Sequence, residues 1–218
     1  MPSTLPFRLA AVLAVVLLAV PLTQAVAPAA GRDTERSTAV RPAPEQRRAT
    51  VVHRVSPVDR SGHLRQDYRV TLTRRGSCWT SSFVNSELYR CFRGNYIQDP
   101  CWRERGRSQP TVICLGLPWT HHVTRLRLTD RLPNTSTGRA PIWGLTLPRD
   151  VNCVFIQGAS EVVNGHRVSY YCRKRWALLD EPDRGRVWHI RTARGRQGDW
   201  EQRRVRPLTD AWKATSLS

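Results

Sequence analysis

The chain has 218 residues with 35 basic and 17 acidic side chains, so its formal net charge is +18. A surface with this charge attracts polyanions such as nucleic acid, teichoic acid or anionic lipid. The chain also has six cysteines, an even number that excludes the unpaired thiol expected of a cysteine enzyme if all of them form disulfides.

The N-terminus predicts a secretory signal peptide over residues 1–25. Arg8 precedes an uninterrupted apolar run from Leu9 to Val20. Twelve helical residues would span only about 18 Å, less than the roughly 30 Å core of a bilayer. The tripeptide ending at Ala25 fits a signal-peptidase site, with Ala27 and Ala30 as alternatives and an uncleaved anchor as the competing interpretation. We therefore expect a secreted, extracellular protein that has no stable membrane span after cleavage. Association of this secreted protein with the cell envelope is an alternative form of the same expectation.

Residues 26–65 are expected to be a flexible linker rich in proline and arginine. Residues 31–65 contain three prolines, eight arginines, four acidic residues and no aromatic residue. Such a segment buries too little apolar surface to offset the entropy lost on ordering. Its one strand-like run, VVHRV at 51–55, could add an edge strand.

Residues 66–218 are expected to form a single β-rich domain. In DYRVTLT, alternate residues are apolar, which is typical of a half-buried strand. Similar runs follow at TVICL, VTRLRLT, WGLTL, NCVFIQ, HRVSYYC and RVWHIRT. This pattern predicts a mainly β, disulfide-stapled antiparallel sandwich or small barrel. One or two short helices are expected, at SELYRCF after the candidate cap Asn85 and at PLTDAWKAT.

The cysteines indicate three disulfides in an oxidising compartment. Their spacings of 13, 13 and 19 residues favour sequential pairing, although six cysteines allow 15 connectivities. A metal site is the alternative, but neither a CxxC nor finger-type Cys/His spacing occurs, so we expect no metal. The six residues are Cys78, Cys91, Cys101, Cys114, Cys153 and Cys172.

The dipeptide Asn164-Gly165 predicts a two-residue hairpin turn, because both central positions of a type I′ turn need positive φ. Simple pairing across that turn would place Cys172 opposite Gln157. A bond between Cys172 and Cys153 therefore requires an excursion of four residues, for which Gly158-Ala159-Ser160 is the candidate.

Catalytic motifs are not recognisable in the sequence. It has no GxSxG, no HExxH and no glycine-rich phosphate loop. On a strand, His121 and His122 would point to opposite faces, so the pair could not easily serve one metal. We expect both in a solvated loop, and His189 should be half-buried in a sheet. Six carboxylates could in principle form a glycosidase pair, but their spacing selects no two of them: Asp99, Glu104, Glu161, Asp180, Glu181 and Asp183. Asp99, before Pro100, is expected to cap local backbone N–H groups.

The best candidate for binding is the segment from Arg184 to Arg206, where eight arginines face two acidic residues and alternate with Trp188 and Trp200. Arginine beside an exposed aromatic ring binds phosphate and stacks on sugars or bases. In the alternative interpretation both tryptophans are core and the arginines line a solvated face. The candidate polyanion-binding residues are Arg194, Arg196, Arg203, Arg204 and Arg206.

The arginine excess has a second explanation. Only Lys174 and Lys213 are lysines, so 33 of the 35 basic residues are arginine. A genome rich in G and C would encode this bias whatever the protein binds.

The succession GSCW, YRC, GNYIQDPCW, VIC, RLP, a tryptophan-containing strand before NC, VNGHRVSYYC and a late AW resembles a group of uncharacterised secreted six-cysteine proteins from actinobacteria. The resemblance covers Gly76 to Trp212. It implies an exported bacterial domain with conserved disulfides, and it explains the arginine bias without a ligand. No activity and no catalytic residue carry over from this group.

These observations favour a non-enzymatic, secreted module that binds at the cell envelope, with polyanions as one ligand class and without a cofactor. The expected partner is an anionic envelope polymer or another secreted protein, with no specific nucleic-acid partner. One alternative is an extracellular hydrolase that acts on envelope or carbohydrate substrates. Another is a structural or inhibitory protein that binds a second secreted protein.

Overall fold

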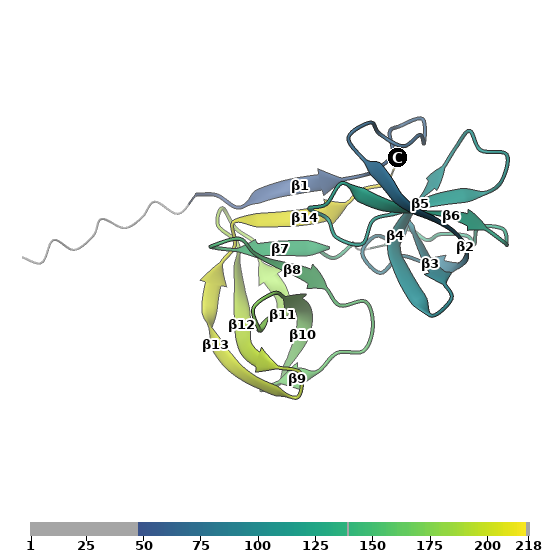
Figure 1. Cartoon of the computed structure of the whole chain (residues 1–218). Coiled ribbons are helices and arrows are strands. Elements are labelled where there is room, and N and C mark those ends of the chain that lie inside the picture. Colours follow the sequence, from purple (N-terminus) through teal and green to yellow (C-terminus); the bar gives the residue numbers. More distant parts are fainter. Residues whose placement is uncertain (1–47, 139, 217–218) are drawn as a thin grey trace, which may run out of the picture. The chain divides into compact units, whose positions relative to one another are not determined.

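The computed structural model describes residues 48–138 and 140–216, and every regular element within them is a β-strand (Figure 1). The expectation of a mainly β fold is therefore confirmed. The expected signal peptide and residues 26–47 lie outside the described residues. The strands are β1 (Val51–Val55), β2 (Arg69–Ser81), β3 (Tyr89–Arg93), β4 (Tyr96–Glu104), β5 (Thr111–Cys114), β6 (His122–Leu128), β7 (Gly144–Leu147), β8 (Val151–Phe155), β9 (Val162–Val163), β10 (His166–Cys172), β11 (Trp176–Asp183), β12 (His189–Arg196), β13 (Asp199–Pro207) and β14 (Asp210–Ala214).

Strands β2 to β6 form a closed five-stranded barrel. Each strand pairs antiparallel with the next, and β2 pairs parallel with β6. The parallel closure follows from the odd number of strands, because the first and fifth strands of a meander run in the same direction. The closure removes the free edges that an open sheet would expose.

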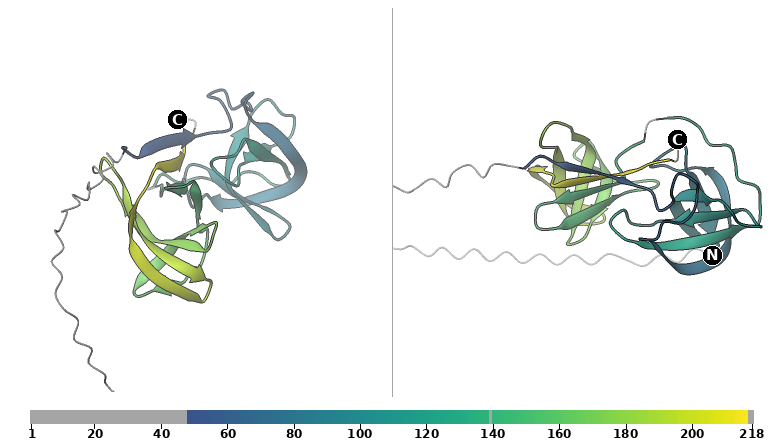
Figure 2. Two further views of the ribbon diagram at one scale, coloured as in Figure 1. Left: turned by 60° about the vertical axis from the view of Figure 1, so that its left-hand side comes forward. Right: turned by 90° about the horizontal axis from the view of Figure 1, so that it is seen from above.

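The remaining strands form a nine-stranded sheet in the order β1, β14, β7, β8, β10, β11, β12 and β13, with β9 paired to β10. Figure 2 shows the strong curvature of its green and yellow strands. Strand β1 is the edge strand that VVHRV suggested, and it pairs parallel with β14. Val58 is buried, and it bridges to Leu64. Ordered structure thus extends into residues expected to belong to the linker.

The predicted sequential disulfides are confirmed, and each joins two residues that face each other on neighbouring antiparallel strands. The Cα–Cα distances are 3.9 to 4.0 Å. The sulfur atoms of Cys91, Cys101 and Cys114 lie within 4.8 Å of one another and belong to a buried cluster of barrel residues. The pairs are Cys78 with Cys91, Cys101 with Cys114, and Cys153 with Cys172.

The Asn164-Gly165 turn is also confirmed. Both residues have positive φ, 50° and 80°, and the turn joins β9 to β10. Strand β10 then pairs with β8 in a register that places Cys172 opposite Cys153. Residues 156–161 between β8 and β9 absorb the four-residue offset that the sequence required.

The two expected helices are wrong. Around SELYRCF, the Asn85 side chain accepts a hydrogen bond from the Glu87 N–H at 3.0 Å, but this caps a turn. Residues Tyr89–Arg93 then pair with β2 on one side and β4 on the other. Residues Asp210–Ala214 of the second segment lie between β1 and β7. Each segment is hydrogen-bonded to a neighbouring strand on both of its edges. This tertiary pairing overrides the local preference for a helix.

One of the core clusters connects the barrel to the sheet. Trp102 of β4 and Trp143, which precedes β7, are fully buried with ring centres 6.2 Å apart. The Trp102 indole donates to the carbonyl of Thr215 at 2.7 Å, and the Asn85 amide donates to the carbonyl of Ala214 at 3.0 Å. The end of β14 is therefore fixed against the barrel by one buried and one partly buried hydrogen bond.

Candidate functional site

Three predicted binding residues, Arg194, Arg204 and Arg206, lie on the β12–β13 hairpin, and two of them, Arg194 and Arg206, contact Trp176 of β11. Trp176 is the register partner of Arg194. The guanidinium carbon of Arg206 lies 4.3 Å from the centre of the Trp176 ring, and that of Arg194 lies 5.5 Å from it. Both distances are within the roughly 6 Å limit of a cation–π interaction.

The backbone of the sheet places these groups on one face. Along β11, Trp176 and Leu178 belong to one hydrophobic cluster, whereas Ala177 and Leu179 belong to another. This division is the two-residue alternation of a strand. The Trp176 ring packs against the first cluster and presents its remaining surface to the two arginines, so the sheet core holds the aromatic platform in place.

Three other arginines act on the charge of Arg206. Burial lowers the pKa of Arg206, and the positive charges of Arg204, Arg149 and Arg194 lower it further. The Nε atom of Arg206 is buried without a hydrogen-bond partner. Like charges held this close repel one another, and an anion placed among them would relieve that repulsion. We call Trp176, Arg149, Arg194, Arg204 and Arg206 the Trp176 cluster.

Two predicted residues do not join the Trp176 cluster. Arg203 forms an ion pair with Glu201 on its own strand. Arg196 faces Asp199 across the end of the β12–β13 hairpin. Sequence analysis also missed Arg149, in the β7–β8 turn, and Trp176. The basic run RKR at 173–175 directly before Trp176 was the one signal that could have indicated it.

The two tryptophans of the predicted segment have different roles. Trp200 packs against Tyr171, with ring centres 6.1 Å apart, and belongs to a core cluster. Trp188 packs partly against the core and carries the guanidinium of Arg184 at 5.3 Å from its ring centre. The core interpretation thus holds for Trp200, whereas Trp188 presents a second arginine–indole contact.

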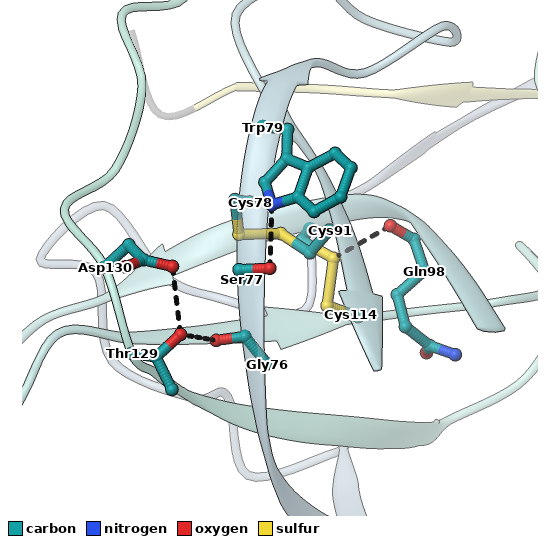
Figure 3. Close-up of a disulfide and its surroundings, with 10 residues drawn as sticks. Gly76, Ser77, Cys78, Trp79, Cys91, Gln98, Cys114, Thr129 and Asp130 are labelled. Carbon is teal, nitrogen blue, oxygen red and sulfur yellow. Dashed lines mark hydrogen bonds between the residues drawn. A yellow bond between two sulfur atoms is a disulfide. The ribbon is translucent and has the colours of Figure 1, made fainter. Parts of the chain in front are cut away.

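A separate aromatic surface lies on the barrel. Trp79 is 70% exposed and contacts Phe92, with ring centres 4.7 Å apart. Its indole N–H donates to Ser77 beside the Cys78 disulfide (Figure 3). The guanidinium of Arg90 lies 4.1 Å from the ring centre of Phe83 and 5.9 Å from that of Phe92. We call Trp79, Phe83, Arg90 and Phe92 the barrel patch.

Asp99 is a buried carboxyl that fastens a turn to β4. Its two oxygens accept hydrogen bonds from the Ser82 hydroxyl and, at 3.1 Å, from the Phe83 N–H. Burial raises the pKa of Asp99 to about 6, although both hydrogen bonds and the charge of Arg90 oppose that rise. The expectation that Asp99 caps local backbone N–H groups is therefore wrong, because the N–H that it caps belongs to Phe83 and is distant in sequence.

The other described carboxylate contacts also serve the fold. Glu104 is buried and accepts two hydrogen bonds from Arg125, both at 2.8 Å. Glu161 accepts from the Gly198 N–H at 2.9 Å. The Asp180 carboxylate lies 2.6 Å from the His166 ring nitrogen and accepts a hydrogen bond from the backbone N–H of Arg167. These carboxylates are thus held in separate structural contacts.

The expectations for His121 and His189 are confirmed, whereas His122 lies in a strand and not in a loop. His121 is exposed in the loop before β6, His122 begins that strand, and His189 is half-buried in β12. Among the described residues, three potential metal ligands come together only at Cys91, Cys101 and Cys114. All three sulfurs are in disulfides, so this group offers no thiolate to a metal.

No protein-family model, curated protein or solved structure matches this chain. The resemblance to secreted six-cysteine proteins therefore stays a prediction. The part of the chain that the structure describes contains no helix that could cross a membrane.

Proposed function

We propose that this protein is a secreted, non-enzymatic module that binds an anionic polymer of the cell envelope through the Trp176 cluster. The observation that carries the proposal is that two arginines, Arg206 and Arg194, contact one indole ring. The positive charges of two further arginines, Arg204 and Arg149, also act on Arg206. A guanidinium presents several donors in a fixed plane that matches phosphate or carboxylate.

The three disulfides support the exported location, because disulfides persist in oxidising compartments. The signal peptide proposed for residues 1–25 would direct the chain there. Without Arg8 the chain would keep 34 basic residues against 17 acidic ones, so a net charge of +17 would steer it toward a polyanionic envelope.

The proposed ligand is a polymer because the basic groups extend along the sheet. Arg184 over Trp188 provides a second contact of the same kind as the two at Trp176. Repeated phosphates along one chain can occupy several such contacts, and each phosphate bound releases condensed counterions. Binding should therefore weaken steeply as salt rises.

The test is cosedimentation of residues 26–218 with purified cell-wall sacculi, before and after removal of their anionic polymers. The variant Arg204→Ala/Arg206→Ala removes two charges of the Trp176 cluster. Arg203→Ala is the matched control, because it removes an exposed arginine of the same strand that already has an acidic partner. We expect binding to be lost with the polymers and with the double variant, and to be kept by the control. Equal binding to stripped sacculi would contradict the proposal.

A second candidate function is binding of another secreted protein through the barrel patch. The 70% exposure of Trp79 and the 45% exposure of Phe83 support it, since aromatic and arginine side chains dominate protein interfaces. A one-to-one complex that survives high salt and is lost in Trp79→Ala would support this candidate. Binding that disappears at moderate salt would oppose it.

A further inference from the structure

A cleft of about 230 Å³ lies where β1, β14 and two loops meet, apart from the residues of the Trp176 cluster. Its wall includes His53 from β1 and Trp212 from β14. The loop before β2 contributes Arg65, Asp67 and Tyr68, and the loop before β6 contributes Pro118, Trp119 and His121. The cleft is smaller than the roughly 300 to 1,000 Å³ of a pocket for drug-sized ligands, so it suits a small ring or one unit of a polymer.

Aromatic rings form one side of this cleft. Trp212 stacks on His53 with ring centres 4.0 Å apart, and Trp119 meets Trp212 edge to face at 6.4 Å. Gly144 makes this packing possible, because a Cβ there would lie 2.7 Å from Pro118 and 3.1 Å from Trp119. The aromatic wall is therefore built into the packing of β7 and β14.

The polar groups of the cleft are oriented by partners. The Arg65 Nε donates to an Asp67 carboxylate oxygen at 3.1 Å. His121 Nδ1 lies 2.9 Å from the Asp67 carbonyl oxygen, and since a carbonyl accepts only, this nitrogen carries the proton. His53 Nε2 lies 2.7 Å from the Asp210 carboxylate. One nitrogen of each imidazole is thus engaged within the protein.

The charge of the cleft differs from that of the Trp176 cluster. Here Arg65 is paired with Asp67, and His53 is paired with Asp210. The cleft thus has hydrogen-bond donors and acceptors beside aromatic rings, and these are the groups that bind a polyhydroxylated ring such as a sugar. Its hydroxyl groups hydrogen-bond to carboxylate and imidazole, and its C–H face packs on an aromatic ring.

We propose that this cleft binds a neutral saccharide unit. The inference stands apart from polyanion binding, because the two sites share no residue. Together they would let one module contact both the glycan and the anionic polymer of an envelope. Arg54 also lines the cleft, so an acidic sugar is the competing ligand that the test must separate.

The experiment is a titration of the full folded chain with neutral oligomers of glucose and of N-acetylglucosamine, and with an oligomer of a uronic acid. Binding is followed by tryptophan fluorescence and by calorimetry at low and high salt. We expect saturable binding of a neutral oligomer that changes less than twofold with salt. Affinity should fall at least tenfold in Trp119→Ala and in His121→Ala.

His121→Ala keeps the test valid if Trp119→Ala unfolds, since His121 is exposed in a loop. Trp79→Ala, which removes an exposed tryptophan of the barrel patch, should bind as the wild type does. Arg206→Ala should also bind the saccharide as the wild type does. Because Arg206 belongs to the Trp176 cluster, this control distinguishes saccharide binding in the cleft from the proposed polyanion binding. No saturable binding of either neutral oligomer, equal binding by His121→Ala, or binding of the uronate alone that disappears with salt would overturn the proposal.

Discussion

The guanidinium of Arg206 lies 4.3 Å from the ring centre of Trp176, and the residues are on strands separated by β12. Arg194, on that intervening strand, lies over the same ring. Three adjacent strands thus contribute to one arginine–indole site. Its geometry depends on sheet register more than on any local motif.

Trp176 is expected to contribute to ligand affinity through its ring. Trp176→Leu should weaken binding of an anionic polymer about threefold to tenfold, because the ring no longer positions the two guanidinium groups. Trp176→Phe retains a ring and should lose less. Equilibrium binding of both variants to polyphosphate checks this, with thermal melts to confirm folding. Equal affinities for Leu and wild type would show that the ring has no role.

Asp99 should make stability depend on pH. Its pKa is raised to about 6 in the folded state, so the folded protein holds this proton more tightly than the unfolded chain does. The contribution of Asp99 is therefore most favourable near pH 4 and is lost as the pH rises through about 6. The loss is at most about 3 kcal/mol.

Asp99→Asn provides the measurement. The unfolding free energy of the wild type minus that of Asp99→Asn should fall between pH 4 and pH 7, as followed by urea denaturation at each pH. Other carboxylates contribute equally to both proteins, so the difference isolates Asp99. A difference that rises over this range would contradict the raised pKa.

Glu104 should be required for stability through its buried ion pair with Arg125. Glu104→Gln leaves the guanidinium of Arg125 without its carboxylate in a largely buried site, with an expected cost of about 3 kcal/mol. Arg107 also contacts Glu104, but its side chain is 48% exposed. Arg107→Ala is therefore the control and should cost less than about 1 kcal/mol. Urea midpoints compare the two variants.

The disulfide between Cys153 and Cys172 should stabilise the sheet. It joins residues 19 apart in sequence, and closing a loop of that length is worth about 3 kcal/mol. Cys153→Ala/Cys172→Ala should lower the urea midpoint accordingly. The intact mass of the wild type should be six hydrogens below that of the reduced chain, one pair for each of the three disulfides, and unchanged by an alkylating agent. Free thiols in the folded protein would contradict the structure.

The sequence predicted the elements that depend on local pattern. Alternation of apolar residues identified β2, β6 and β10, and the Asn164-Gly165 turn fixed the register from which the four-residue excursion followed. Cysteine spacing indicated the pairing because each disulfide spans neighbouring strands.

The features that the sequence did not predict depend on tertiary pairing. Tyr89–Arg93 and Asp210–Ala214 are strands because each is bonded on both edges. Arg149 joins the Trp176 cluster from a distant turn. The cleft lined by His53 and Trp212 contains residues from opposite ends of the folded chain, which are brought together by the parallel pairing of β1 and β14.

The most direct test of polyanion binding is the salt dependence of polyphosphate affinity for the wild type, for Arg204→Ala/Arg206→Ala and for Arg203→Ala. Each phosphate contact contributes about 0.7 to 0.9 to the slope of log affinity against log salt. We predict a steep wild-type slope, a reduction of about 2 in the double variant and little change in Arg203→Ala. Equal slopes for all three proteins would show that the arginines around Trp176 do not bind the polymer.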